Sequence, residues 1–187
     1  MTETSLYSPA IAAIEQGGVV AYPTESCFGL GCDPNNQAAV LKILELKQRN
    51  ISKGLILIAH DYSQLLPFVD DGAISQDKRF QVFSHWPGPV TLLLPAKPNT
   101  ARYLKGDFDT IAVRVTNHPV ARELCRQADT ALVSTSANLA GQPSAVSAQE
   151  VKNIFAEQVD YVLDQPIGQR TKPSKILNPL TGEVFRS

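Results

Sequence analysis

Residues 131–144 read ALVSTSANLAGQPS, and this stretch says most about the fold. Three apolar residues, of the kind that fill a buried strand, run directly into the small hydroxyl and amide side chains of 134–138. In open α/β sheets, ligands bind just outside strand ends, where loop amides and hydroxyls face a crevice. Serine and asparagine also cap ordinary turns, so a turn and an anion-binding loop both fit the pattern.

Helical and strand patterns alternate along the rest of the chain. Strands are predicted at 19–23, 54–59, 89–96, 111–116 and 131–136, with short strands in 160–164, 173–177 and 182–187. Helices are predicted after four N-caps, namely Ser8, Asn35 or Asn36, Asn117 and Ser147, and within 61–69 and 75–86. Several connections are too short for parallel crossovers, which predicts one mixed α/β sheet with flanking helices in a single domain, residues 1–187.

The composition favours a globular protein that does not act through a broad charge field. Of 187 residues, 43% are hydrophobic and 19% charged, and the net charge is −1, which argues against a general affinity for nucleic acid or anionic membrane. The three cysteines form no C-x-x-C pair, which is typical of a reducing compartment. Because no apolar run reaches the ~20 residues of a membrane span and no signal-peptide pattern begins the sequence, we expect a cytoplasmic protein without membrane contact.

The common nucleotide and metal motifs are missing from the sequence. There is no GxxxxGK[ST] loop and no GxGxxG after a strand, and the three histidines are scattered. What remains is a set of polar clusters beside apolar segments. They are YPTES at 22–26, KQR at 47–49, Arg114 within a strand, STSAN at 134–138 and RTKPSK at 170–175.

Lys47 and Arg49 are two residues apart, so their side chains diverge by ~200° on a helix but share one face of an extended segment. The two cations can hold one polyanion only if the helix ends near Lys47. We expect Asn50, in a left-handed conformation, to end it. The alternative is a solvated helix terminus, where basic side chains suit the helix dipole.

Arg114 interrupts an otherwise apolar strand, on the face opposite Val113 and Val115. Its guanidinium either grips a carboxylate or phosphate in a pocket through two parallel hydrogen bonds, or serves no ligand and instead reaches solvent or pairs with an acid such as Asp107 or Asp109. The residues by themselves leave both interpretations open.

Five segments resemble the YrdC-like family in order and spacing. They are AYPTESCFGLGCDP, LKQR with KGLILIA, HWPGPVTLLLPA, DTIAVRVTNHP and LVSTSANLAGQPS, and the similarity runs from about Ser8 to the C-terminus. The K-x-R and S-x-S-A-N signatures are its most specific part. The resemblance implies a twisted sheet of mixed parallel and antiparallel strands with a deep, positively lined concave face.

The resemblance also implies a nucleotidyltransferase activity. Such an enzyme condenses L-threonine, bicarbonate or carbon dioxide, and ATP to threonylcarbamoyl-AMP and pyrophosphate, for the threonylcarbamoyladenosine modification of tRNA. We expect Mg²⁺ to bind on the phosphates, because the sequence offers no evident carboxylate cage. We also expect transient contact with the tRNA threonylcarbamoyl transferase complex and weak or absent tRNA binding. The alternative is an RNA-binding module that uses the concave face without nucleotide turnover.

Residue roles follow from the resemblance, position by position. The threonine site would comprise Thr24, Lys53, Arg114 and Ser134. Lys47 and Arg49 would be the catalytic clamp on the phosphates. The nucleotide would also meet Thr110, Ser136, Asn138, Ser144, Ser174 and Arg186.

Overall fold

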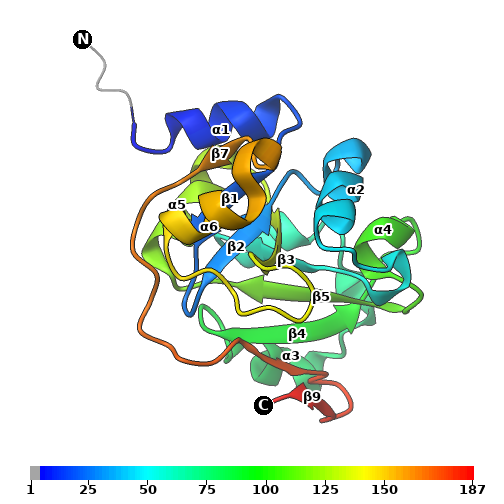
Figure 1. Ribbon diagram of the computed structural model, residues 1–187. Helices are drawn as coiled ribbons and strands as arrows, with labels where there is room; N and C mark the ends of the chain where they lie inside the picture. The colour runs from blue at the N-terminus through cyan, green and yellow to red at the C-terminus, as the bar shows by residue number, and fades with distance from the viewer. Residues whose placement is uncertain (1–4) are drawn as a thin grey trace.

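The computed structural model describes residues 5–187 (Figure 1). The helices are α1 (Ser8–Glu15), α2 (Gln37–Leu46), α3 (Gln76–Phe83), α4 (Arg102–Lys105), α5 (Pro119–Ala128) and α6 (Ala148–Phe155). The strands are β1 (Val20–Pro23), β2 (Phe28–Gly31), β3 (Ile56–Ala59), β4 (Val90–Pro95), β5 (Thr110–Val115), β6 (Leu132–Ser136), β7 (Tyr161–Val162), β8 (Lys175–Leu177) and β9 (Val184–Arg186). Short 3₁₀ turns occupy Ile51–Lys53, Tyr62–Leu65, Asp71–Ala73 and Ala156–Gln158.

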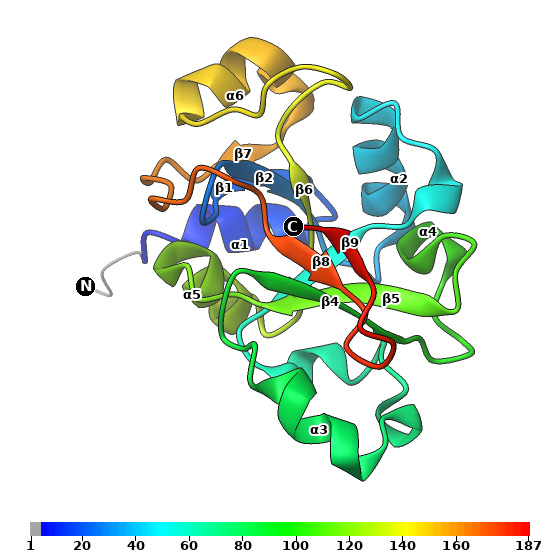
Figure 2. The ribbon, with the colours of Figure 1, turned by 90° about the horizontal axis from the view of Figure 1, so that it is seen from below.

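All of these strands join one sheet in the order β7-β1-β2-β6-β3-β5-β4-β8-β9. The pairs β1–β7, β3–β5 and β4–β8 are parallel, and the other neighbours are antiparallel. The predicted α/β class with a mixed sheet and flanking helices is therefore confirmed. Figure 2 shows β8 and β9 lying along β4, which brings the last residues of the chain over the middle of the molecule.

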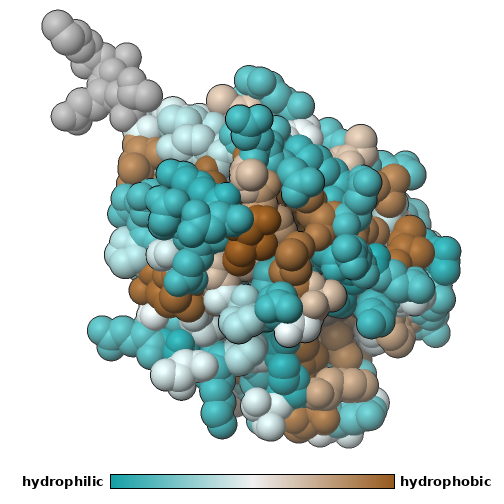
Figure 3. Space-filling model, viewed as in Figure 1, coloured by the Kyte–Doolittle hydropathy of each residue, from teal (hydrophilic) through white to brown (hydrophobic). Residues whose placement is uncertain are grey.

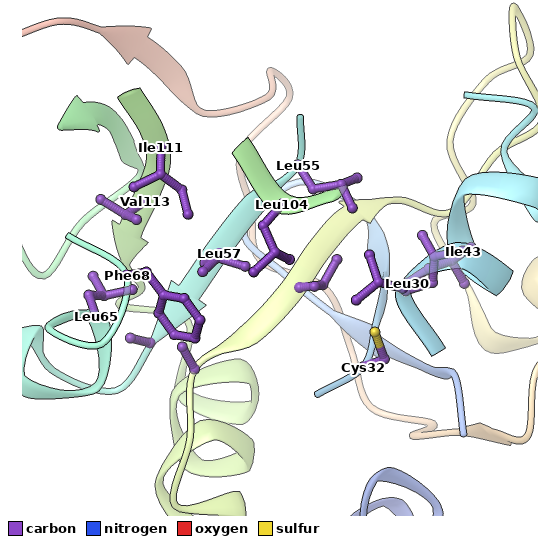
Figure 4. Close-up of a cluster of buried hydrophobic side chains, with 14 of the residues drawn as sticks. Leu30, Cys32, Ile43, Leu55, Leu57, Leu65, Phe68, Leu104, Ile111 and Val113 are labelled. Atoms are coloured by element: carbon purple, nitrogen blue, oxygen red, sulfur yellow. The ribbon is translucent and has the colours of Figure 1, made fainter. Parts of the chain in front are cut away.

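One face of the sheet carries the larger hydrophobic core. Alternate strand residues point into it, among them Leu57 of β3 and Val113 of β5, and α2, α3, α4 and α6 contribute side chains from the other side. In Figure 4, Ile43 of α2 lies beside Leu30 of β2, while Leu65 and Phe68 lie beside the β5 residues. Successive side chains of a strand point to opposite faces of the sheet, so alternate residues belong to this core and the residues between them to the opposite face.

The opposite face is only partly covered. Helices α1 and α5 pack over Val20 and Tyr22 of β1, Ile58 of β3 and Leu132 of β6 in a second, smaller core. Other side chains on this same face line a cavity instead, among them Ile56 of β3, Ala112 and Arg114 of β5, and Ser134 of β6. The cavity therefore lies beside these two helices on the concave side of the sheet.

Local capping chemistry follows the sequence at two helices and departs from it at two others. The side chains of Asn36 and Ser147 accept hydrogen bonds from the first turns of α2 and α6, as predicted. Ser8 is the first residue of α1 rather than its cap, because the helix already includes it before Pro9. His118, not Asn117, caps α5 through a side chain that accepts from the amide of Ala121.

Strand β2 was not predicted, because its sequence FGLG is half glycine and such stretches usually form turns. Gly31 is needed here because a neighbouring strand and an aromatic ring come very close. A Cβ on Gly31 would lie 2.3 Å from the carbonyl oxygen of Val133 and 2.7 Å from the Tyr22 ring. Crowding by neighbours therefore explains the glycine at position 31.

Candidate active site

The cavity on the concave face has a volume of about 480 Å³. Two of the residues predicted for the site, Lys47 and Asn138, lie behind its wall. The other predicted residues line it: Thr24, Arg49, Lys53, Thr110, Arg114, Ser134, Ser136, Ser144, Ser174 and Arg186. The structure thus brings together side chains from widely separated parts of the chain.

Lys47 is buried and holds the loop that follows β6. Its ammonium donates to the carbonyl oxygens of Ser136 at 2.7 Å and Asn138 at 2.8 Å, and to the Oδ1 atom of Asn138 at 2.5 Å. Burial, and to a lesser extent the nearby charge of Arg49, lowers the pKa of Lys47 to about 8. The lysine side chain therefore binds the STSAN segment on the side facing away from the cavity. Ser136 lies between its ammonium group and the cavity.

The helix does end near Lys47, but by a different residue from the one expected. α2 stops at Leu46, and Gln48 adopts the left-handed conformation with φ of 48°. Asn50, for which this conformation was predicted, has φ of −67° and caps the next 3₁₀ turn through its side chain. The turn at Gln48 lets Lys47 and Arg49 serve the same site from one chain segment.

Arg49 reaches the cavity and is anchored on its far side. Its Nε and Nη2 atoms donate to the carbonyl oxygen of Gly54 at 3.0 and 2.9 Å. Burial lowers its pKa, although the guanidinium remains charged at neutral pH. Within residues 5–187 the remaining donors of this fixed guanidinium make no hydrogen bond, so they can meet an anion in the cavity.

Arg114 lies on the cavity floor and keeps most of its donors unused. The residue is 6% exposed, its Nη1 atom donates to Thr91 Oγ1 at 3.3 Å, and its Nε atom is buried without a partner within residues 5–187. Its acidic neighbour is Glu25, whose Oε2 atom lies 3.5 Å from Nη2. The suggested pairing with Asp107 or Asp109 is wrong, because the ion-pair partner of Arg114 is Glu25. Asp107 forms an ion pair with Arg102 instead.

A polar chain runs from Arg114 to the last strand. Thr91 and Ser174 share a hydrogen bond of 2.9 Å between their hydroxyl oxygens. Arg186 donates from Nε to the carbonyl oxygen of Ser174 at 2.7 Å and from Nη2 to its hydroxyl at 2.9 Å. The positions of Arg114 and Arg186 are thus linked through the hydroxyl groups of Thr91 and Ser174.

Thr24 and Ser134 flank a glycine on the cavity wall. A Cβ at Gly29 would meet Ser134 Oγ at 3.4 Å and the Thr24 methyl group at 3.5 Å. Both residues are buried, and the Thr24 hydroxyl donates to the carbonyl oxygen of Cys27 at 2.7 Å. The glycine leaves room for a small ligand between a methyl group and a hydroxyl.

Sequence reasoning missed Glu25 and Thr91 as site residues. Glu25 stands in the YPTES segment that had been singled out, so its position was signalled although its role was not. Thr91 is a fully buried strand residue whose hydroxyl contacts both Arg114 and Ser174, and nothing in its sequence context distinguishes it from an ordinary strand threonine.

The part of the chain that the structure describes contains no group of three or more His, Cys, Asp or Glu side chains able to hold a metal ion. The polar atoms that line the cavity belong mainly to arginine, lysine, serine and threonine. This donor set suits anions rather than a protein-bound metal.

Comparison with known proteins supplies the family. The family model for Sua5, YciO and YrdC proteins, whose description reads "Telomere recombination", matches residues 12–187. The chain belongs to the Sua5/YciO/YrdC family. It is similar to "Threonylcarbamoyl-AMP synthase" of Idiomarina loihiensis, with 60% identity over 90% of this chain and 91% of that protein. The protein of the same name from Pseudoalteromonas translucida is 51% identical over the full length of both chains.

Solved structures of Sua5/YciO/YrdC proteins share the fold. P. abyssi Sua5 complexed with L-threonine superposes with a TM-score of 0.84 at 29% identity, covering 94% of this chain and 52% of that one. E. coli YciO gives a TM-score of 0.82 at 27% identity, covering 97% and 88%. The fold implied by the resemblance is therefore confirmed.

Within residues 5–187, no helix combines the length and the apolar character needed to cross a bilayer. On the face shown in Figure 3, apolar side chains lie in small groups between hydrophilic ones.

Proposed function

We propose that this member of the Sua5/YciO/YrdC family is a threonylcarbamoyl-AMP synthase, which joins L-threonine, bicarbonate or carbon dioxide, and ATP with release of pyrophosphate. The observation that carries the proposal is the buried Arg114 guanidinium, whose Nε has no partner within the described residues, in a cavity that also holds Arg49, Lys53 and Arg186. Relatives that are 60% and 51% identical over 90% and 100% of this chain bear this name.

Arg114, Thr24, Ser134 and Lys53 form the amino-acid end of the cavity. The threonine carboxylate lies against Arg114, where a planar guanidinium offers two parallel donors. The β-hydroxyl and methyl groups fit between Ser134 and Thr24, beside Gly29. The exposed Lys53 adds a cation at the rim of the cavity.

The triphosphate lies along the other hydroxyls and cations. Arg49 meets the phosphates directly, and Lys47 adds its charge from behind Ser136. The nucleotide further contacts Thr110, Ser136, Ser144, Ser174 and Arg186, with Asn138 holding the loop from outside the cavity.

The chemistry asks for positioning and charge neutralisation. The threonine amine adds to carbon dioxide and loses a proton, giving a carbamate. A carbamate oxygen then forms a bond to the α-phosphorus of ATP while the bond to the bridging oxygen breaks, and pyrophosphate leaves. Preorganised cations stabilise the charge that builds up on the phosphates. Side chains that hold charge in fixed places are adequate for this reaction.

Mg²⁺ fits this site only as a partner of the nucleotide. The described residues that line the cavity offer Glu25 as their one carboxylate, and that group faces Arg114. We therefore propose that Mg²⁺ binds to the phosphates with water as its remaining ligands and neutralises charge on the leaving pyrophosphate.

The product is an activated, short-lived adenylate, so a transferase must consume it promptly. We propose transient contact with the tRNA threonylcarbamoyl transferase complex, weak or absent tRNA binding, and a cytoplasmic location. The RNA-binding alternative is less favoured, because the cations lie inside a cavity of about 480 Å³ rather than along an open surface.

The deciding experiment measures pyrophosphate release from ATP, omitting threonine and bicarbonate in turn. Release should require both, and liquid chromatography of the mixture should show threonylcarbamoyl-AMP. Release that is independent of both substrates would overturn the proposal.

A further inference from the structure

Glu25 is a carboxylate at the floor of a cavity otherwise built for anions. The residue is 9% exposed, lines the cavity and lies next to Arg114. A negative charge weakens the attraction of such a site for phosphate or carboxylate, so its presence there requires a reason. Two candidate reasons are that it orients Arg114 and that it binds a cationic part of the ligand.

The contacts of the two carboxylate oxygens differ. Oε1 accepts a hydrogen bond of 2.7 Å from the hydroxyl of the fully buried Thr116. Oε2 accepts no hydrogen bond from residues 5–187 and lies 3.5 Å from Arg114 Nη2. A strong arginine–carboxylate pair is shorter, with two parallel bonds. One oxygen of Glu25 is thus anchored, while the other is left open beside an arginine that also has unused donors.

The backbone of Glu25 is fixed as well as its side chain. Its carbonyl oxygen accepts from the amide of Arg170 at 3.1 Å, and the neighbouring carbonyl of Thr24 accepts from the amide of Gly168 at 2.9 Å. A Cβ on Gly168 would lie 2.5 Å from the Glu25 carbonyl oxygen, so this approach requires glycine. Held at both ends, the side chain keeps Oε2 in one place without help from Arg114.

An α-amino acid carries its carboxylate and its ammonium group on the same carbon atom. A receptor for such a zwitterion needs a fixed cation and a fixed anion side by side, each with free hydrogen-bonding capacity. Arg114 and Glu25 meet this description. Resting on the function proposed above, we infer that Glu25 binds the α-ammonium group of the amino-acid substrate and makes the site specific for zwitterions over simple hydroxy acids.

The test separates binding of the amine from orientation of Arg114. 3-Hydroxybutyrate has threonine's carboxylate and hydroxyl but hydrogen in place of the amine, so it probes Arg114 alone. We compare the KM for threonine with the inhibition constant of 3-hydroxybutyrate in the parent, in Glu25→Gln and in Asp109→Asn. The last is a matched control, because it removes the same charge at an exposed residue before β5.

Glu25→Gln should raise the KM for threonine about 10- to 100-fold, the effect of losing a hydrogen bond to a charged group. The inhibition constant of 3-hydroxybutyrate should change less than about threefold, and Asp109→Asn should change neither. Equal weakening of both ligands would mean that Glu25 acts through Arg114, and unchanged threonine binding would mean that it has no role. Either result overturns the inference.

If the Glu25→Gln variant does not fold, a measurement on the parent protein still tests the inference. If Glu25 binds the ammonium group, the unaltered enzyme must prefer threonine to 3-hydroxybutyrate by at least about tenfold. Comparable affinities would overturn the inference even while threonine-dependent pyrophosphate release upholds the synthase function. Absence of that release would instead count against the proposed function.

Discussion

Replacing Lys47 with methionine tests whether the loop after β6 depends on a buried charge. Methionine keeps an unbranched side chain of similar length but cannot donate a hydrogen bond. The carbonyl oxygen of Asn138 would then lose the donor that it has in the structure, whereas that of Ser136 would keep the amide of Asn138 at 3.0 Å. The substitution therefore removes support from one end of the loop.

The size of the effect follows from these contacts. An unsatisfied carbonyl costs ~1–3 kcal/mol when fully buried; that of Asn138 is part-buried, and relief from burying an ammonium offsets part of the cost. For a chain of 187 residues, each kcal/mol moves Tm by about 2–4 °C, so we expect a fall of about 2–8 °C. Turnover should fall by ~10² or more, because the site would lose a positive charge placed directly behind Ser136 in the cavity wall.

Two measurements check this, namely Tm by calorimetry and kcat by pyrophosphate release. Lys42→Met is the matched control, because Lys42 lies in α2, the helix that ends just before Lys47, but forms a surface ion pair with Asp160. Surface pairs contribute about 0–1 kcal/mol, so this variant should keep its activity and nearly all of its stability. If Lys47→Met worked at more than half of the parent rate, the loop would not need the ammonium and the assignment would fail.

Three further results are expected. Arg114→Lys should raise the KM for threonine about tenfold or more and that for ATP much less, since an ammonium cannot reproduce two parallel bonds; equal effects on both substrates would argue against the assigned role. Values of kcat/KM should decrease from threonine to serine to valine, because valine leaves the Ser134 hydroxyl without the partner that a β-hydroxyl provides; a valine rate equal to that of serine would contradict this. Because the ammonium of Lys47, with a pKa lowered to about 8, is lost as pH rises, kcat/KM for ATP should fall above pH 8, and Lys47→Arg, if active, should show no such decline.

The sequence predicts what depends on neighbouring residues. A period of two puts Arg114 opposite Val113, and the structure places these side chains on opposite faces of the sheet. Asn36 and Ser147 cap their helices because capping involves residues only three positions apart. These features require no knowledge of the rest of the chain.

The remaining features arise from contacts between distant segments. Lys47 binds Asn138, which is 91 positions away in the sequence. No pattern near Lys47 indicates that its ammonium group holds the loop after β6. The pairing of Arg114 with Glu25 depends on how β1 and β5 lie in the sheet, whereas Asp107 is closer in sequence but turned away. The same holds for β2, where Gly31 is required by the close approach of Tyr22 from β1 and Val133 from β6.

Strand β9 lies at one edge of the sheet, and its residue Arg186 lines the cavity. The stability of β9 is therefore linked to ligand binding in the cavity. Its three residues are exposed, and it pairs only with β8, through a register that contains an irregularity. Strands held this way open at a small fraction of the free energy of global unfolding. Each opening removes Arg186 from Ser174, so under the proposed role of these two residues nucleotide affinity should scale with the fraction of molecules in which the strand is closed. A bound nucleotide should accordingly slow amide hydrogen exchange in β9 more than in β7, the edge strand at the other end of the sheet.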